Sequence, residues 1–199
     1  IDLTANPGVA TITIALTIPT FENVIWNGNW GDWWPSKSAG PDYWACGAQL
    51  RVEGSQAGGD DTAANGIKMM FCKSVDWSKQ DTVSIHDGIW GDWSSMVMCP
   101  EGYYIDGAQV RFEDYCGNCD DTALNGLRIS CRSRENKSKK QWLTVHEGWW
   151  GEWKPDSFDP DHFVTAVSVR FEANQQSGDD TALNGLKFTY DDSSTCING

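Results

Sequence analysis

The sequence predicts an all-β protein built from three copies of one structural unit. An eight-residue phrase occurs three times, about sixty residues apart: GDDTAANG at 59–66, CDDTALNG at 119–126 and GDDTALNG at 178–185. A second phrase keeps the same spacing: IWNGNWGDW at 25–33, IHDGIWGDW at 85–93 and VHEGWWGEW at 145–153. Two phrases that share one period indicate an internal threefold repeat, and a repeat decides the architecture before any weaker signal.

The strands are predicted from the alternation of apolar and polar residues. Every second side chain is apolar in AQLRVE at 48–53, AQVRFE at 108–113 and VSVRFE at 167–172. A period of two is typical of a strand with one buried face. A second strand follows each Asp-Asp-Thr phrase, with one face formed by Ile67, Met69 and Phe71, by Leu127, Ile129 and Cys131, and by Leu186, Phe188 and Tyr190. A third, rich in β-branched residues, is predicted in each unit: TITIALTI at 11–18, TVSIHDG at 82–88 and LTVHEG at 143–148.

The three units are predicted to share one core. A unit of about sixty residues buries too little surface to be stable alone. We therefore expect a single domain over residues 1–199, with repeat units at about 10–72, 73–132 and 133–191 and a short C-terminal tail at 192–199. No stretch of the sequence has the run of about eighteen apolar residues that a membrane-spanning helix needs.

The cysteine content and the charge indicate the compartment and the partners. Seven cysteines without a zinc-type pair of Cys-x-x-Cys motifs favour disulfides, so we expect a secreted, extracellular protein whose signal peptide has been removed. Asn136, in the sequence Asn-Lys-Ser, is a candidate N-glycosylation site. The net charge of −13 argues against nucleic acid and anionic membranes as partners. Cations, basic proteins and neutral polymers remain possible partners. A high net charge also increases solubility.

The Asp-Asp-Thr phrase has a structural and a functional interpretation. As a connection between strands, its Asn-Gly pair at 65–66, 125–126 and 184–185 tolerates the positive φ angles of a tight turn, and Asp and Thr side chains cap such turns. Alternatively, the carboxylates gather at one end of a threefold axis and bind a cation or sugar hydroxyls. The candidate ligand-binding aspartates are Asp60, Asp61, Asp120, Asp121, Asp179 and Asp180. Their spacing does not match a dedicated calcium loop, so neither a metal nor another cofactor is predicted.

The twelve tryptophans fall into a matched and an unmatched set. Six occupy equivalent places in the three units and are predicted to form core layers: Trp30, Trp33, Trp90, Trp93, Trp150 and Trp153. The unmatched ones are freer to be exposed and to stack on a sugar ring; they are Trp26, Trp34, Trp44, Trp77, Trp142 and Trp149. Of these, we take Trp26, Trp34, Trp44 and Trp149 as candidate ligand contacts.

The triplicated WG-x-W phrase, with an alternating strand and then Asp-Asp-Thr-Ala-x-Asn, resembles the vitelline membrane outer layer protein I family over about residues 10–191. The resemblance implies a β-prism of three Greek-key sheets related by a pseudo-threefold axis. It also implies a secreted protein of an egg coat or another extracellular layer, and jacalin-like lectins use the same architecture.

We therefore expect glycan-binding activity, with extracellular glycans or glycoproteins as partners and no catalysis. Two alternatives stay open: a purely structural egg-coat component, and a weak glycan-transferring or glycan-hydrolysing enzyme that uses paired carboxylates, an activity linked to the family. The sequence offers no recognisable nucleophile motif and no way to choose a carboxylate pair, so no catalytic residue is assigned.

The resemblance also implies a disulfide between Cys99 and Cys131, which bracket the two main strands of the middle unit. Cys46 and Cys72 bracket the same strands of the first unit, and a bridge is predicted there too, although Cys46 comes about seven positions later in the repeat frame than Cys99. The third unit has no such pair.

Cys116 and Cys119, in YCGNC, are predicted to close a small disulfide ring beside the middle aspartates. Cys196 is then left over in the tail. Three alternatives stay open for Cys196. It forms a disulfide with a second chain and so makes a homo- or hetero-oligomer, it bonds to another cysteine of the same chain, or it stays a free thiol.

Overall fold

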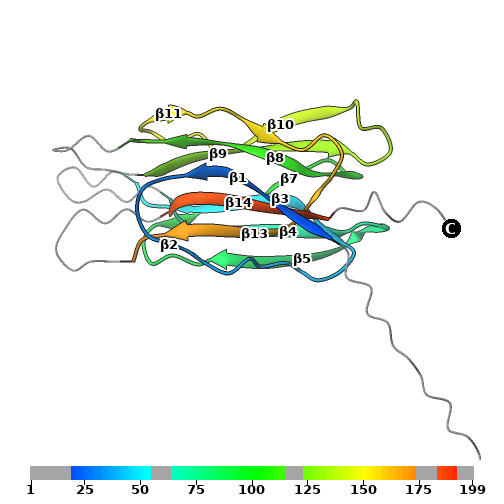
Figure 1. Cartoon of the computed structure of the whole chain (residues 1–199), viewed down its shortest axis with the longest axis horizontal. Helices are drawn as coiled ribbons and strands as arrows, with labels where there is room; N and C mark the ends of the chain where they lie inside the picture. Colours follow the sequence, from blue (N-terminus) through cyan, green and yellow to red (C-terminus); the bar gives the residue numbers. More distant parts are fainter. Residues whose placement is uncertain (1–18, 55–63, 115–122, 174–182, 192–199) are drawn as a thin grey trace, which may run out of the picture.

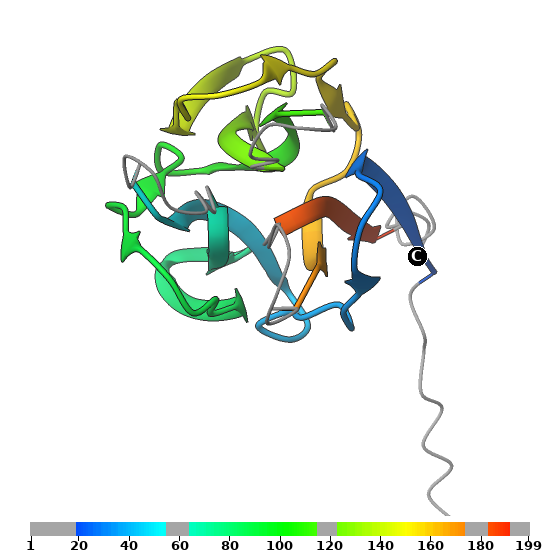
Figure 2. The same ribbon diagram turned by 90° about the vertical axis from the view of Figure 1, so that its left-hand side faces the viewer.

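The structure is a computed structural model that describes residues 19–54, 64–114, 123–173 and 183–191. All regular structure in these residues is β-strand, as predicted. Three antiparallel sheets form the faces of a triangular prism, and the end-on view in Figure 2 shows them around a common axis. The fold is a β-prism, which confirms the predicted fold class. Within the described residues no helix is long and apolar enough to cross a membrane.

Each sheet has the same strand order. Sheet I has the order β5-β4-β3-β6, with β7 also paired to β3, and comprises β3 (Tyr43–Val52), β4 (Ala64–Lys73), β5 (Asp76–His86), β6 (Asp92–Trp93) and β7 (Val97–Met98). Sheet II has the order β10-β9-β8-β11, with β12 also paired to β8, and comprises β8 (Tyr103–Phe112), β9 (Leu124–Ser133), β10 (Lys140–His146), β11 (Glu152–Trp153) and β12 (Ser157–Phe158). Three strands joined in sequence and a fourth that returns beside the first make a Greek key.

Sheet III is assembled from both ends of the described chain. It has the order β1-β14-β13-β2 and comprises β13 (Val164–Phe171), β14 (Leu183–Asp191), β1 (Thr20–Asn27) and β2 (Asp32–Trp33). β1 pairs with β14, so Thr20 lies opposite Asp191. The first sequence unit therefore contributes to two sheets. The predicted strand at 11–18 lies outside the described residues, and β1 forms the outer strand of sheet III.

The alternation predicted for the inner strands is confirmed in β3 and β8, whereas in β13 the polar Ser168 is also buried and Phe171 is only partly buried. Ala48, Leu50 and Val52 of β3 are buried, whereas Gln49 and Arg51 between them are only partly buried. The inner strands β3, β8 and β13 contact one another across the axis. One apolar cluster takes side chains from all three sheets, so the prism has a common interior.

Two of the predicted disulfides are present. Cys46–Cys72 links β3 to β4, and Cys99–Cys131 links the segment before β8 to β9. Cys116, Cys119 and Cys196 lie outside the described residues, so their pairing stays a prediction.

The Asn-Gly pairs do not form turns, and this part of the prediction is wrong. They lie inside β4, β9 and β14. The glycine serves a close approach instead. A Cβ atom on Gly66 would lie 2.6 Å from the carbonyl oxygen of Asp87, and one on Gly126 would lie 2.6 Å from that of Glu147. The connection after the third strand of the sheet therefore runs directly against this glycine and excludes a side chain.

The matched tryptophans do not form core layers, and this prediction is also wrong. Trp93 is the register partner of the outward-facing Arg51, so it lies on the outer face of sheet I. The Lys68 ammonium lies 4.0 Å from its ring centroid. Arg128 covers Trp153 and Lys187 covers Trp33 in the same way on the other two sheets, at 3.9 and 5.2 Å. Trp30 and Trp90 are about half-exposed, at 46% and 50%.

Candidate functional site

The two ends of the prism carry different features. At the left-hand end in Figure 1, strands β1, β8 and β13 finish and the three Trp-Gly phrases follow β1, β5 and β10. At the opposite end lie the turn between β4 and β5, the start of β8 and the connection between β9 and β10. We refer to these as the loop end and the cavity end.

The loop end is held by one arginine from each sheet. Arg51 Nε donates to the Gly91 carbonyl at 2.9 Å, and its Nη1 donates to the carbonyls of Asp87 and Gly88. Arg111 makes the corresponding bonds in sheet II and Arg170 in sheet III. A planar guanidinium with several donors fixes several carbonyls at once. The Trp-Gly phrases therefore have a structural role, because an arginine fixes two or three backbone carbonyls of each phrase.

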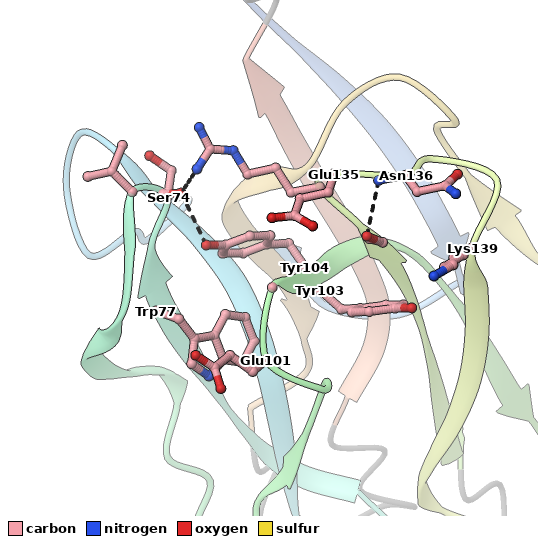
Figure 3. Close-up of a pocket in the computed structure, with 12 residues that line it drawn as sticks. Ser74, Trp77, Glu101, Tyr103, Tyr104, Glu135, Asn136 and Lys139 are labelled. Carbon is pink, nitrogen blue, oxygen red and sulfur yellow. Dashed lines mark hydrogen bonds between the residues drawn. The ribbon is translucent and has the colours of Figure 1, made fainter.

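A cavity of about 580 Å³ opens at the cavity end, where sheets I and II meet. It is lined from three segments that are distant in sequence: residues 74–77, 101–104 and 133–139. In Figure 3, the side chains of Trp77 and Glu101 lie on one side of the opening, and those of Asn136 and Lys139 lie on the other. We refer to this space as the large cavity.

Aromatic side chains form the floor of the large cavity. Trp77 and Tyr103 are partly buried, and the ring of Trp77 meets that of the fully buried Tyr104 edge to face at 5.2 Å. The Tyr104 hydroxyl donates to the carbonyl of Ser74 (Figure 3) and to that of Lys73. Burial raises the pKa of Tyr104, against the opposing charge of Arg134. Its hydroxyl thus remains a hydrogen-bond donor at any physiological pH.

The rim of the large cavity carries charged side chains, and part of it is formed by the β9–β10 connection. Glu101, Glu135 and Lys139 are exposed at the opening. Hydrogen bonds close the β9–β10 connection: the Ser133 amide donates to the Lys139 carbonyl at 3.0 Å, and the Lys139 amide donates to the Asn136 carbonyl at 2.9 Å. The backbone that carries Glu135 and Lys139 is therefore fixed before any ligand arrives, which lowers the entropy lost on binding.

A second space, the small cavity, has a volume of about 130 Å³ and is lined by Trp44, Arg134, Lys137, Asp161, His162, Phe163 and Asp191. His162 Nδ1 lies 2.8 Å from Asp159 Oδ1, which also accepts the backbone N–H groups of Asp161 and His162. Burial is the largest influence on the pKa of Asp159 and raises it, but these hydrogen bonds together outweigh burial and lower the pKa. Burial raises the pKa of Asp191.

Three equivalent aromatic residues meet at this end of the prism, one from each sheet. Trp44, Tyr104 and Phe163 each come directly before the same register position of the inner strand. Their ring centroids lie 4.9 to 5.4 Å apart. This aromatic trio connects the floors of the two cavities.

The structure separates the four tryptophans that were predicted to bind ligand. Trp44 lines the small cavity. Trp26 is partly buried against Phe112, and Trp34, 43% exposed, meets the ring of His86 edge to face. Trp149 is exposed at the loop end. The six candidate aspartates of the Asp-Asp-Thr phrases, Asp60, Asp61, Asp120, Asp121, Asp179 and Asp180, all lie outside the described residues.

Sequence reasoning missed most of the cavity. Trp77 was only one of the unmatched tryptophans, and Glu101, Tyr103 and Tyr104 were not singled out. One signal was available: the segments PDYW, EGYY and PDHF place an aromatic residue at 44, 104 and 163. Within the described residues no group of three or more His, Cys, Asp or Glu side chains is placed to hold a metal ion.

The sheets and the cavity define a β-prism protein with a polar, aromatic cavity at one end. The family model described as Vitelline membrane outer layer protein I (VOMI) matches residues 21–100 and 82–197. The chain therefore belongs to the VOMI family.

The curated relatives match a smaller part of the chain. Vitelline membrane outer layer protein 1 homologs of Mus musculus and Homo sapiens are each 36% identical to it over 107 residues, which is 53% of this chain and 53% of the relative. The match thus spans about half the length of these relatives.

Solved structures share the fold at low identity. The Calystegia sepium agglutinin matches with a TM-score of 0.55 and 13% identity, over 88% of this chain and 98% of that chain. A mannose-specific jacalin-related lectin from Morus Nigra matches with a TM-score of 0.53 and 10% identity, over 91% and 99%. At such identities the likeness establishes the fold alone.

Proposed function

We propose that this protein is a secreted component of an egg coat or another extracellular layer, and that it binds glycans in the large cavity. Membership of the VOMI family and the disulfides Cys46–Cys72 and Cys99–Cys131 support an extracellular location. The fold shared with a mannose-specific lectin supports a carbohydrate ligand. Extracellular glycans or glycoproteins are thus the partners.

The observation that carries the proposal is the composition of the large cavity. A sugar ring has apolar C–H faces and a rim of hydroxyl groups. Trp77 and Tyr103 supply aromatic surface for the faces, and Glu101, Glu135 and Lys139 supply charged acceptors and donors for the hydroxyls. A volume of about 580 Å³ lies within the range of small-molecule sites. Binding through these groups needs neither a metal nor another cofactor.

We also propose that Asn136 carries an N-linked glycan. It is exposed on the β9–β10 connection. Its Oδ1 accepts a hydrogen bond from the Ser138 hydroxyl at 2.6 Å, so the two functional residues of the sequon are in contact. Mass measurement of protein from a secreting eukaryotic host, before and after release of N-glycans, tests this modification.

The direct test is a screen of labelled protein on a broad glycan array, repeated with calcium and with a chelator. The proposal expects one sugar class to bind equally in both buffers, and Glu101→Gln with Lys139→Ala to remove most of the signal. Both residues are exposed at the rim, so the variant should fold. Binding that disappears with chelator would instead support a site in the Asp-Asp-Thr segments. A folded protein that binds nothing would support a purely structural coat component.

One observation favours a second candidate function, transfer or hydrolysis of glycans. Glu101 and Glu135 line the same cavity, and glycoside chemistry uses two carboxylates on opposite sides of a bond. An assay of oligosaccharide products by mass spectrometry tests it. Glu101→Gln and Glu135→Gln should each abolish turnover, whereas glycan binding should weaken without being lost, because each variant alters only one of the polar contacts of the cavity. Absence of any product with the wild-type protein, under conditions where it binds the glycan, would eliminate this candidate.

A further inference from the structure

The large and small cavities have one lining residue in common, Arg134. Its guanidinium donates a hydrogen bond to the Ser74 carbonyl oxygen, in the large cavity. The same guanidinium lies 5.5 Å from the ring centroid of Trp44, in the small cavity. The Arg134 side chain therefore lies across the boundary between the two spaces.

One aromatic floor continues beneath this boundary. Trp77 and Tyr104 belong to the large cavity, and Trp44 and Phe163 belong to the small one. The rings of Tyr104 and Trp44 meet edge to face at 5.0 Å, so the aromatic residues beneath the two cavities are in direct contact. Trp77 and Trp44 are the partly buried members of this set, one in each cavity, so each cavity offers one indole to a sugar ring.

Arg134 has donors left for a ligand. Its side chain is exposed, and within the described residues its guanidinium forms no ion pair with a carboxylate. A guanidinium has five N–H donors, and the bond to Ser74 uses one. The remaining donors can reach hydroxyl groups on either side while the planar group stays on Trp44.

We infer that the two cavities are subsites of one groove and that the preferred ligand is an oligosaccharide whose chain crosses Arg134. The inference rests on the proposed glycan binding and adds chain length as the property that is recognised. A single sugar ring occupies the large cavity. A longer chain also reaches the small cavity, where Lys137, Asp161 and His162 offer charged and polar partners for its hydroxyls.

The test is calorimetric titration with oligosaccharides of mannose, glucose, galactose and N-acetylglucosamine, each supplied from the monosaccharide to the hexasaccharide. For the sugar that binds, we expect the wild-type hexasaccharide affinity to exceed the monosaccharide affinity by about tenfold or more. Arg134→Ala should reduce this ratio to about twofold, and Arg134→Lys should also reduce it, because a compact ammonium lacks the width and the planar donor arrangement of the guanidinium. Asp161→Asn should lower the ratio in the same direction.

Arg128→Ala is the matched control, since it removes an arginine from the outer face of sheet II, where it covers Trp153. It should keep the wild-type ratio. An affinity that does not depend on chain length, or an Arg134→Ala variant that keeps the full ratio, would overturn the inference while leaving glycan binding intact. A wild-type protein that binds none of the sugars would instead refute the proposed function, and this inference with it.

Discussion

Three equivalent residues form a bulge in the inner strands of the prism: Cys46, Asp106 and Thr165. Each is linked to the neighbouring strand by different chemistry. Cys46 forms a disulfide, Asp106 accepts a hydrogen bond from Arg132 Nε at 2.5 Å, and the Thr165 hydroxyl donates to a backbone carbonyl at 3.2 Å. The position therefore requires a link across the two inner strands and tolerates covalent, ionic and neutral forms of it.

The ionic form predicts a large effect of neutralising Asp106. Its side chain is fully buried and that of Arg132 is 9% exposed, so Asp106→Asn leaves a buried cation without its counter-charge. We expect the free energy of unfolding in urea to fall by about 3 kcal/mol. Asp114→Asn breaks the ion pair between Asp114 and Lys154. The Asp114 side chain is 70% exposed, so this variant should lower the free energy of unfolding by less than about 1 kcal/mol. Equal losses in the two variants would refute the role of burial.

His86 predicts a pH dependence of stability. Its ring stacks on Phe171 at 3.9 Å, and burial lowers its pKa below 6.5, although a hydrogen bond to the Asn65 carbonyl opposes the shift. The folded protein therefore favours the neutral ring. The unfolded chain takes up a proton first as the pH falls, so this contribution to stability is complete above pH 6.5 and is lost as the pH falls toward the folded pKa.

The variant His86→Gln removes this titration. The urea unfolding free energy of the wild-type protein should fall more steeply than that of the variant between pH 7 and pH 5, the interval around the ordinary histidine pKa of about 6.5. Parallel pH profiles for the two proteins would show that His86 does not contribute to the dependence.

At the scale of the elements, one arginine of each sheet determines how a Trp-Gly phrase is placed. Arg51, Arg111 and Arg170 each bond several backbone carbonyls of such a phrase, and we call each of them an arginine fork. Arg111 holds the carbonyls of Glu147, Gly148 and Gly151. Arg111→Ala removes these donors, and we expect a loss of about 2 to 3 kcal/mol in unfolding free energy. Amide hydrogen exchange should accelerate more in residues 147–151 than in β4, where only the lower global stability speeds exchange. Exchange that is unchanged at 147–151 would contradict a structural role for the fork.

The inner strands could be predicted from sequence because their signal is local. β3, β8 and β13 alternate with a period of two, and that period alone assigns a buried face. The prediction of turns at the Asn-Gly pairs was wrong because a contact between residues distant in sequence, the approach of Asp87 to Gly66, outweighs the local preference for a turn. The prediction for the matched tryptophans was wrong because the size of a side chain favours burial but does not indicate on which face of the sheet it lies.

The candidate site could not be predicted, for a related reason. Its lining comes from residues 74–77, 101–104 and 133–139, and only the closed prism brings these segments together. No window of sequence contains the cavity. The aromatic residues at 44, 104 and 163 repeat with the period of the units, but their meeting at one end follows from the threefold arrangement of the sheets.

At the scale of the whole molecule, sheet III predicts that the chain can be permuted. Thr20 and Asp191 are register partners, so a short linker can join them. New ends between Ala39 and Gly40 would interrupt the connection before β3. There is open space at this point, because a Cβ atom on Gly40 would meet nothing within 4 Å. The permuted chain would then make each sheet from a continuous stretch. We expect cooperative unfolding and a wild-type near-ultraviolet circular dichroism spectrum. Loss of both would contradict the closure of sheet III by β1.

The central claim is that glycans bind at the cavity end, and the indole N–H signals of the tryptophans in nuclear magnetic resonance spectra test it most directly. Trp77 lies in the large cavity and Trp90 is exposed at the loop end, so each reports on one end. Trp77→Phe and Trp90→Phe assign the two signals. On titration with the glycan that the array selects, the Trp77 signal should shift in a saturable way while the Trp90 signal stays in place. A shift of Trp90 with an unmoved Trp77 would place the ligand at the opposite end and contradict the account.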